Sequence, residues 1–340
     1  MKDSKAYEPA MRRAMELSLL GPKYGANPQV GAVILDEKLT IIAEGFHNGA
    51  GTAHAEVVAL EKLETIPANA TAVVTLEPCN HQGRTGPCAK ALIEAGISRV
   101  IFGATDPGDE SAHGAKTLEQ AGIEVFGGLL QEEIIRQQKP WFTATKFKRP
   151  FISLKWAQTL DGRSAASDKT SKWISGSVSR NHVHKLRSEI DAIIVGTSTA
   201  LLDDPELTAR KEDGSLYEHQ PLRVVVGESA LPGELRIFNE LAKTEVFATR
   251  DIKSVINDLY DKQFKHVLVE GGAKLISSFI ALGLFDEILI YQAPLLVGGT
   301  NVAVEDIGIT TMQAAIQLEF QEVVQLGEDI FIRAIPRGEN

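Results

Sequence analysis

Both cysteines of this 340-residue chain, Cys79 and Cys88, fall within the single stretch TLEPCNHQGRTGPC, and a His-x-Glu pair precedes them as His54 and Glu56 in AHAEVV. In a chain of intracellular type, so few cysteines point to metal or catalytic chemistry rather than to a disulfide. Zinc binds thiolate and imidazole in a tetrahedral shell, and a catalytic zinc keeps three protein ligands and one position for water. We therefore expect Zn²⁺ to bind His54, Cys79 and Cys88.

Glu56 is expected to act on protons rather than to bind the metal. It lies two positions after His54, at the start of a predicted helix, so its side chain points to another part of the same turn. A carboxylate beside a metal-activated water can take the proton of that water and pass it to a leaving amine. Cys88 follows Pro87 at a second predicted helix start, where the helix dipole favours a thiolate.

The spacing of these residues is close to that of zinc deaminases but not identical to it. Those enzymes carry H-x-E and P-C-x-x-C, with a His/Cys/Cys site and a glutamate that is not a ligand. This chain has H-A-E and two Pro-Cys pairs, and eight residues, NHQGRTGP, separate the cysteines. We expect this insert to form a loop that shapes the pocket. A purely structural zinc site is the alternative, with His81 as the fourth ligand.

The elements around this constellation alternate between strands and helices. We expect strands at 30–35, 40–46, 70–77 and 99–105 and helices at 54–63 and 86–97. Residues 129–150 are expected to form a helix, a break at Pro140 and a short basic connector, after which the alternation restarts. This pattern predicts two α/β domains, 1–147 and 148–340, each with a sheet covered by helices.

Composition excludes several classes of protein. The formal net charge is −10, which disfavours a nucleic-acid deaminase because phosphate-backbone binding needs a basic face. No apolar run is long enough to span a bilayer, and the N-terminus has no apolar core of a signal peptide. We therefore expect a cytoplasmic protein without a membrane or nucleic-acid partner.

The motifs NPQVGAVIL, HAEVVAL, TLEPCNHQGRTGPC and ALIEAGISRVIFGATDP resemble the deaminase half of the bifunctional riboflavin-biosynthesis deaminase–reductases. The resemblance implies a cytidine-deaminase-like three-layer α/β/α domain. It places zinc on His54, Cys79 and Cys88 and the proton shuttle on Glu56. It also implies that Asn27 contacts the substrate, although a plain turn residue before a proline would look the same.

The second half resembles the reductase half of the same family in SLKWAQTLDGR, SKWISG, LRSEIDAIIVGTSTALLDDPELTAR, VEGGAKL and APLLVGG. This implies a dihydrofolate-reductase-like α/β domain that uses NADPH, although no G-x-G-x-x-G or P-loop motif occurs. The cofactor-binding residues that the resemblance implies are Ala157, Trp173, Thr199, Asp203, Gly272, Ala273, Lys274, Leu275, Ile276, Ser277 and Ser278. The substrate-binding residues that it implies are Ser171, Arg187, Leu207, Arg210 and Glu270.

Physical chemistry supports some of these roles. Arg187 and Arg210 can each grip a sugar phosphate with paired, charge-assisted hydrogen bonds, and an exposed salt bridge is the alternative. Lys155 lies among apolar residues in ISLKWA, which suggests a partly buried lysine near the substrate. The alternative is an edge-strand lysine that faces water. Trp173 could stack on the nicotinamide or ribose, or could pack in the core.

The resemblance implies a complete function. The first domain would deaminate 2,5-diamino-6-(ribosylamino)-4(3H)-pyrimidinone 5′-phosphate. The second would then reduce the ribosyl group to ribityl with NADPH, as a 5-amino-6-(5-phosphoribosylamino)uracil reductase. The expected partner is this small pyrimidine ribosyl phosphate, and we expect a homo-oligomer formed through the reductase domain.

Overall fold

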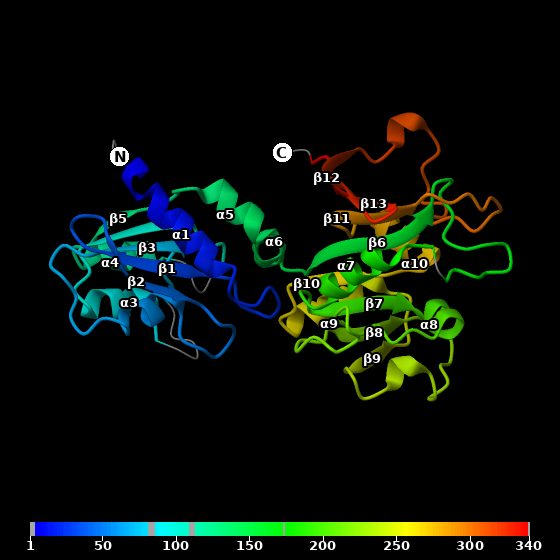
Figure 1. Cartoon of the computed structure of the whole chain (residues 1–340), viewed down its shortest axis with the longest axis horizontal. Coiled ribbons are helices and arrows are strands. Elements are labelled where there is room, and N and C mark those ends of the chain that lie inside the picture. Colours follow the sequence, from blue (N-terminus) through cyan, green and yellow to red (C-terminus); the bar gives the residue numbers. More distant parts are fainter. Residues whose placement is uncertain (1–3, 81–85, 109–112, 173, 339–340) are drawn as a thin grey trace. The chain divides into compact units, whose positions relative to one another are not determined.

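The chain forms two compact units, Met1–Lys148 and Arg149–Asn340, in the computed structural model (Figure 1). The boundary expected from the sequence, between residues 147 and 148, is one residue earlier. Each unit has its own sheet and its own buried hydrophobic core. The structure describes residues 4–80, 86–108, 113–172 and 174–338.

The first unit is built on a five-stranded sheet with the order β2-β1-β3-β4-β5. Strand β1 is antiparallel to β2 and β3, whereas β3, β4 and β5 run parallel to one another. Every residue of β1 and β3 is buried, as expected for central strands covered on both faces. The strands are β1 (Gly31–Leu35), β2 (Ile41–Phe46), β3 (Thr71–Leu76), β4 (Arg99–Ala104) and β5 (Glu124–Phe126).

Helices cover this sheet and complete a three-layer α/β/α unit (Figure 1). Helix α1 packs on β1, β2 and β3, and α2 packs on β1 and β2. The helices are η1 (Ser4–Tyr7), α1 (Glu8–Ser18), α2 (Ala55–Leu60), α3 (Cys88–Glu94), α4 (Gly114–Gln120), α5 (Gln131–Gln137) and α6 (Lys139–Phe147). The expected break at Pro140 is wrong in position. The helical path is interrupted at Gln138, and Pro140 lies in the first turn of α6, where its missing N–H is not needed.

Two glycines allow the helices to lie unusually close to the sheet. A Cβ atom on Gly31 would lie 1.9 Å from the backbone oxygen of Ala14 in α1. A Cβ atom on Gly45 would lie 2.2 Å from the backbone oxygen of Ala55 and 2.6 Å from the nitrogen of Ala59, both in α2. Because α2 begins directly after His54, the missing side chain at Gly45 sets the position of that histidine.

A Gly45→Ala substitution should therefore lower both stability and zinc content. Overpacking of this kind costs about 1–3 kcal/mol, and the added methyl group can be accommodated only if α2 moves outward. The free energy of unfolding and the bound zinc per chain measure the two effects. Gly233→Ala is the matched control, because its Cβ meets no described atom within 4 Å. Equal zinc content in both variants would contradict this role of Gly45.

The second unit contains an eight-stranded sheet with the order β12-β13-β11-β6-β10-β7-β8-β9. From β11 to β9 all neighbours are parallel, whereas β12 and β13 form an antiparallel hairpin that joins β11. The strands are β6 (Phe151–Thr159), β7 (Ala192–Gly196), β8 (Leu222–Val226), β9 (Thr244–Phe247), β10 (His266–Val269), β11 (Glu287–Ala293), β12 (Leu318–Leu326) and β13 (Asp329–Pro336).

Both faces of this second sheet are buried at its central strands. Ile194 of β7 belongs to one core cluster, whereas its neighbours Ile193 and Val195 belong to the other, as the two-residue period of a strand requires. The helices are α7 (Ser177–Arg187), α8 (Thr197–Asp203), η2 (Arg236–Phe238), α9 (Ile252–Asp261), α10 (Ala273–Ala281) and η3 (Met312–Ala314). Within the described ranges, no helix is long and apolar enough to cross a bilayer.

Strand β12 was not expected from the sequence. The inner positions of β12 are all exposed. The sequence LEFQEVVQL therefore did not need the alternation of apolar and polar residues that reveals a half-buried strand. Only β13, which lies between β12 and β11, shows the expected pattern.

Candidate active sites

The first unit brings the three expected zinc ligands together. The donor atoms of His54, Cys79 and Cys88 all lie within 4.8 Å of one another. The Nδ1 atom of His54 lies 3.0 Å from the Sγ atom of Cys88 and 3.5 Å from that of Cys79. Each residue comes from a different segment: His54 caps α2, Cys79 follows β3, and Cys88 begins α3.

This donor set fits zinc. One imidazole nitrogen and two sulfurs match a three-ligand zinc shell, and zinc bonds of about 2.1–2.3 Å bring such atoms to the separations seen here. The backbone N–H of Cys88 also donates a hydrogen bond to Cys79 Sγ at 3.4 Å, which favours a thiolate. His81, the alternative fourth ligand, lies outside the described residues.

Burial and hydrogen bonding shift the pKa values of the two cysteines and of Glu56. The pKa of Cys79 is lowered to about 4, because Cys88 and His54 hydrogen-bond to its sulfur. The pKa of Cys88 is raised by the same hydrogen bond and by burial. Burial also raises the pKa of Glu56, whose side chain is 3% exposed in the first turn of α2. A carboxyl group with a raised pKa holds a proton more readily than an exposed glutamate, as a group that both accepts and returns a proton must.

His47 belongs to the same site, and sequence reasoning missed it. It is buried, and its ring lies edge-on to that of His54 at a centroid distance of 5.2 Å. Its Nδ1 atom lies 3.1 Å from the Ala53 carbonyl oxygen, so this nitrogen carries the hydrogen. Its Nε2 atom then accepts from the Asn27 amide at 2.9 Å and fixes the orientation of that side chain. The only sequence signal was its position shortly before the His-x-Glu pair.

In the second unit, several of the expected reductase residues lie at or near the carboxyl ends of neighbouring parallel strands. Strands β6, β10 and β7 are parallel neighbours, and ligands of such sheets bind at the carboxyl ends of the strands. Ala157 lies near the end of β6, Thr199 follows β7, and Gly272 follows β10. The Gly272 N–H donates to Thr199 Oγ1 at 2.7 Å, which joins two of the three segments.

The remaining expected cofactor residues differ in exposure. Ser171 donates a hydrogen bond to Asp203 at 3.3 Å. In α10, Ile276 and Ser277 point into the core, and Ser277 Oγ accepts from the backbone of Glu305, whereas Lys274 and Ser278 are exposed. Trp173 lies outside the described residues.

Lys155, Arg187 and Glu270 form a buried ionic cluster at this edge. Glu270 follows β10 and accepts two hydrogen bonds from Arg187 of α7, at 2.6 and 2.8 Å. Lys155 Nζ lies 3.6 Å from Glu270 and 5.5 Å from the centre of the Tyr291 ring. Because β6 lies between β11 and β10, Lys155 is on a central strand, and the alternative of an edge-strand lysine is wrong.

Charge balance within this cluster shifts its ionisation. Burial raises the pKa of Glu270, but the positive charges of Arg187 and Lys155 outweigh it and lower the pKa to about 2. Burial lowers the pKa of Lys155 despite the neighbouring Glu270. Glu270 is therefore a carboxylate over the whole physiological pH range.

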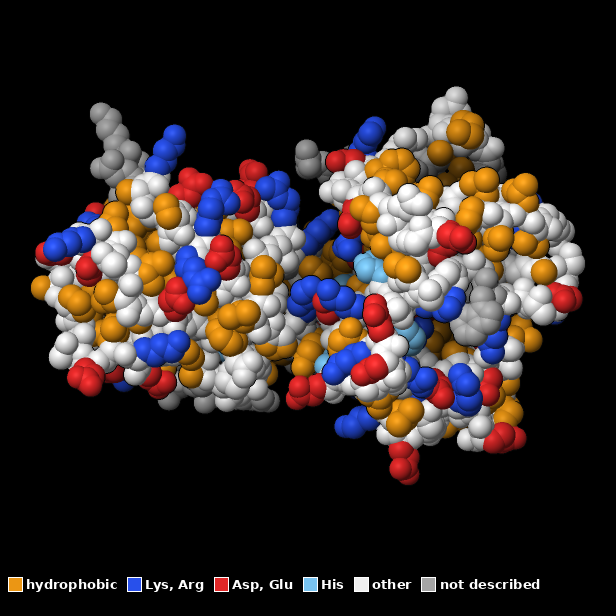
Figure 2. Space-filling view, viewed as in Figure 1, with side chains coloured by type: hydrophobic (Ala, Val, Ile, Leu, Met, Phe, Trp, Pro, Cys, Tyr) orange, Lys and Arg blue, Asp and Glu red, His pale blue; other side chains and the backbone are white. Residues whose placement is uncertain are grey.

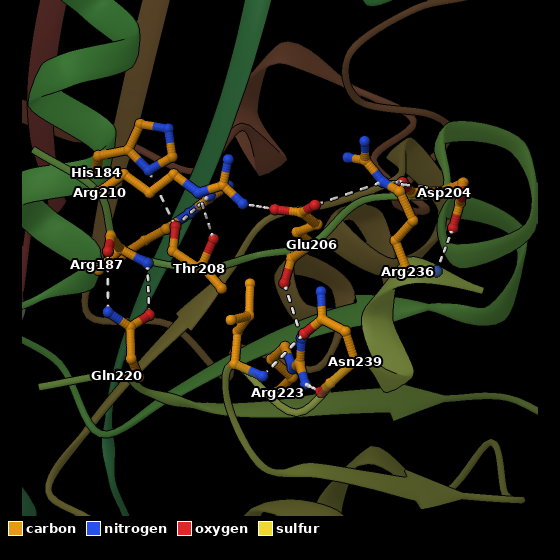
Figure 3. Close-up of polar contacts among 12 residues, drawn as sticks. His184, Arg187, Asp204, Glu206, Thr208, Arg210, Gln220, Arg223, Arg236 and Asn239 are labelled. Atoms are coloured by element: carbon orange, nitrogen blue, oxygen red, sulfur yellow. Dashed lines mark hydrogen bonds and ion pairs between the residues drawn. The ribbon is translucent and has the colours of Figure 1, made fainter. Parts of the chain in front are cut away.

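The two arginines expected to bind phosphate have different surroundings (Figure 3). Arg187 is committed to Glu270 and to the carbonyl oxygen of Thr208, at 3.1 Å. Arg210 donates to Thr208 Oγ1 at 2.9 Å and pairs with Glu206, and its side chain is 34% exposed. Arg236 lies on the other side of Glu206, at 3.9 Å. Of the two arginines expected to bind phosphate, Arg210 is therefore the more exposed.

The low pKa of Glu270 predicts a loss of stability in acid. The folded pKa of about 2 lies below the ordinary value of 4.5, so this contribution is complete above about pH 4.5 and is lost as pH falls toward 2. The shift corresponds to about 3 kcal/mol. Unfolding of the chain by urea between pH 5 and pH 2.5 should show a falling midpoint for the second unit.

Comparison with known proteins identifies the two halves. Residues 4–104 match the cytidine and deoxycytidylate deaminase zinc-binding region, and residues 150–332 match the RibD C-terminal domain. The fold and the site therefore define a two-domain enzyme in which a deaminase is joined to a reductase.

Full-length relatives share this arrangement. The riboflavin biosynthesis protein RibD of Mycobacterium tuberculosis is 41% identical over 98% of both chains, and that of Aquifex aeolicus is 37% identical over 90% of this chain and 91% of its own. The crystal structure of a diaminohydroxyphosphoribosylaminopyrimidine deaminase/5-amino-6-(5-phosphoribosylamino)uracil reductase from Thermotoga maritima superposes with a TM-score of 0.87 at 34% identity, covering 97% of this chain and 98% of that chain. Acinetobacter baumannii RibD superposes with a TM-score of 0.89 at 34% identity, covering 98% and 99%.

The chain belongs to the RibD family of bifunctional riboflavin biosynthesis enzymes. This confirms the family, the fold class and the paired deaminase and reductase activities expected from the sequence.

Proposed function

We propose that the chain deaminates 2,5-diamino-6-(ribosylamino)-4(3H)-pyrimidinone 5′-phosphate and then reduces the ribosyl group of the product to ribityl with NADPH. The observation that carries this proposal is the presence in one chain of two sites: a His/Cys/Cys cluster beside a buried glutamate, and a cationic edge on a parallel sheet. The activities of the Thermotoga maritima relative support the same pair of reactions.

In the deaminase unit, His54, Cys79 and Cys88 would hold Zn²⁺. Zinc, when bound, lowers the pKa of a water molecule to about 7 and so supplies a nucleophile at neutral pH. Glu56 accepts the proton of the attacking water and delivers it to the departing amine, for which its raised pKa is suited. Asn27, oriented by His47, contacts the pyrimidine.

In the reductase unit, NADPH supplies the hydride that reduces C1′ of the sugar. Ala157, Thr199 and Asp203 contact the cofactor together with Trp173 and the exposed positions of the 272–278 segment. Lys155 and Glu270 orient the sugar at the strand ends. Ser171, Leu207 and Arg210 hold the rest of the substrate, and Arg187 acts on it through Glu270.

An assay of the purified chain with the diaminopyrimidine ribosyl phosphate tests both activities. Without NADPH, the deaminated ribosyl product should accumulate and ammonia should be released. With NADPH, the ribityl compound should form, and NADPH oxidation should equal its yield. A variant with an inactive first unit should not oxidise NADPH when it is given the substrate that still carries the amine. NADPH oxidation in that assay would refute the order of deamination before reduction.

We also propose a cytoplasmic homo-oligomer formed through the second unit. Hydrophobic side chains gather at the upper edge of this unit (Figure 2). The edge strand β12 carries three exposed hydrophobic side chains, Phe320, Val323 and Val324, with exposed fractions of 68, 57 and 39%. Exposed apolar edge strands usually pair with another chain.

Val323→Lys should shift the chain from oligomer to monomer, because a charge on β12 opposes burial of this strand. Light scattering of the full chain measures the mass directly. Leu282→Lys, at an exposed apolar position directly after α10, is the control substitution and should leave the mass unchanged. A monomeric parent chain would contradict the proposed assembly.

A further inference from the structure

The segment Glu206–Arg210 carries two of the expected substrate residues and has a backbone that needs support. Leu207 has a φ of +52°, a left-handed conformation that is rare for a residue with a branched side chain. Such a conformation is unfavourable and persists only when the surroundings impose it. Leu207, Thr208 and Ala209 are also buried, so their backbone groups need partners within the protein.

Side chains from helix α7, from strand β8 and from the loop before β8 supply those partners (Figure 3). The carbonyl oxygen of Thr208 accepts from His184 at 2.9 Å and from Arg187 at 3.1 Å. The amide of Gln220 bonds both backbone groups of Ala209, at 2.8 and 2.9 Å. The end of the segment at Arg210 is therefore fixed.

Arg223 fixes the beginning of the segment. It lies on β8, is fully buried, and donates through Nη1 to the carbonyl oxygen of Glu206 at 3.2 Å. The same guanidinium donates to the side-chain oxygen of Asn239 at 2.8 Å, to its carbonyl oxygen at 2.6 Å, and to the carbonyl oxygen of Ala242. It thus joins the start of the substrate segment to the turn before β9.

Stability alone does not account for Arg223. Among the described residues, no carboxylate lies within ion-pair distance of it, and burial lowers its pKa. A buried cation balanced only by neutral oxygens is costly, and an apolar side chain of similar size is often more stable at such a place. What the guanidinium provides, and an apolar side chain cannot, is a forked set of donors that fixes two segments relative to each other.

We propose that Arg223 is a positioning residue for substrate binding in the reductase unit. By holding the Glu206 carbonyl, it sets the left-handed turn at Leu207 and, through it, the place of the Arg210 guanidinium. This inference rests on the proposed role of Arg210 in binding the substrate. Arg223 itself is buried and touches neither substrate nor cofactor.

Steady-state kinetics of the reductase reaction in the full chain test this role. Arg223→Ala should raise the KM for the deaminated ribosyl phosphate about tenfold to a hundredfold, because small displacements of a binding group have effects of that size. The KM for NADPH and the deaminase rate should not change, since the first unit folds around its own core. Guanidinium chloride at millimolar concentration should restore the substrate KM of this variant. Arg250→Ala, which removes an exposed arginine of the same unit, is the control.

Arg223→Lys serves as a second variant that keeps the charge but loses the fork. It should fold and show the same rise in substrate KM, without rescue by guanidinium. An unchanged substrate KM in both variants, or an equal rise in the KM for NADPH, would overturn the inference. Arg210→Ala separates this failure from that of the proposed function: if it raises the substrate KM while the Arg223 variants do not, only the role of Arg223 falls. If none of these variants alters the substrate KM, the proposed binding of the substrate by Arg210 is wrong as well.

Discussion

Glu56→Gln should abolish deamination by the chain and leave its zinc content unchanged. The amide has the shape of the carboxylic acid but cannot take a proton from water or pass one to the leaving amine. Loss of a positioned general acid–base costs about a hundredfold to ten-thousandfold in rate, and here one group serves both proton transfers, so the upper end is expected. Ammonia release and bound zinc per chain are the two measurements.

The second unit and an exposed glutamate of α2 provide controls for this variant. The reductase reaction, started from the deaminated substrate, should proceed at the parental rate, because it takes place in the other unit. Glu61→Gln, at the exposed end of α2, should keep both activities. Loss of zinc from the Glu56 variant would make Glu56 part of the metal site, and full deaminase activity would remove it from the mechanism.

The zinc constellation could be predicted from the sequence because its chemistry lies in residue types that are rare in this chain. Two cysteines, each after a proline, and one His-x-Glu pair leave few other interpretations. Local rules also placed them well: His54 is the N-cap residue of α2 and Cys88 begins α3, close to where the two helix starts were expected. His47 could not be found in this way, because its role depends on contact with Asn27 and His54 rather than on its neighbours in sequence.

The reductase site shows where sequence reasoning ends. Arg187 and Glu270 are far apart in the chain. Lys155 of β6 comes close to Glu270 only because β6 lies beside β10 in the sheet order β6-β10-β7. Sequence patterns identify strands but not their order, so a lysine on a central strand and one on an edge strand look alike. For the same reason Arg223 looked like an ordinary residue of a β-strand, although it is fully buried and supports a distant loop.

Glu270→Gln should destabilise the second unit more than any other single change to its charged groups. The substitution leaves Arg187 and Lys155 buried without a counter-charge, and breaking a buried ion pair in this way costs about 3–5 kcal/mol. Reductase activity should be lost as well, because Lys155 and Arg187 are held by the carboxylate. Urea unfolding, followed with both enzyme activities, should show an early transition that removes the reductase and a later one that removes the deaminase.

The pH dependence of the unfolding midpoint tests whether the charge of Glu270 stabilises the second unit. In the parent chain, the stabilisation from Glu270 disappears as pH falls from about 4.5 toward the folded pKa of about 2, whereas the glutamine cannot titrate. For the second unit, the unfolding midpoints of the parent and of the Glu270→Gln variant should therefore converge in acid and differ most near neutral pH. Adding Lys155→Met to the Glu270 variant removes one unpaired cation, so it should recover part of the stability but none of the reductase activity. A difference between the midpoints that stays constant at every pH would mean that ionisation of Glu270 is not the source of the stabilisation, and would contradict the ionic cluster as the support of the reductase site.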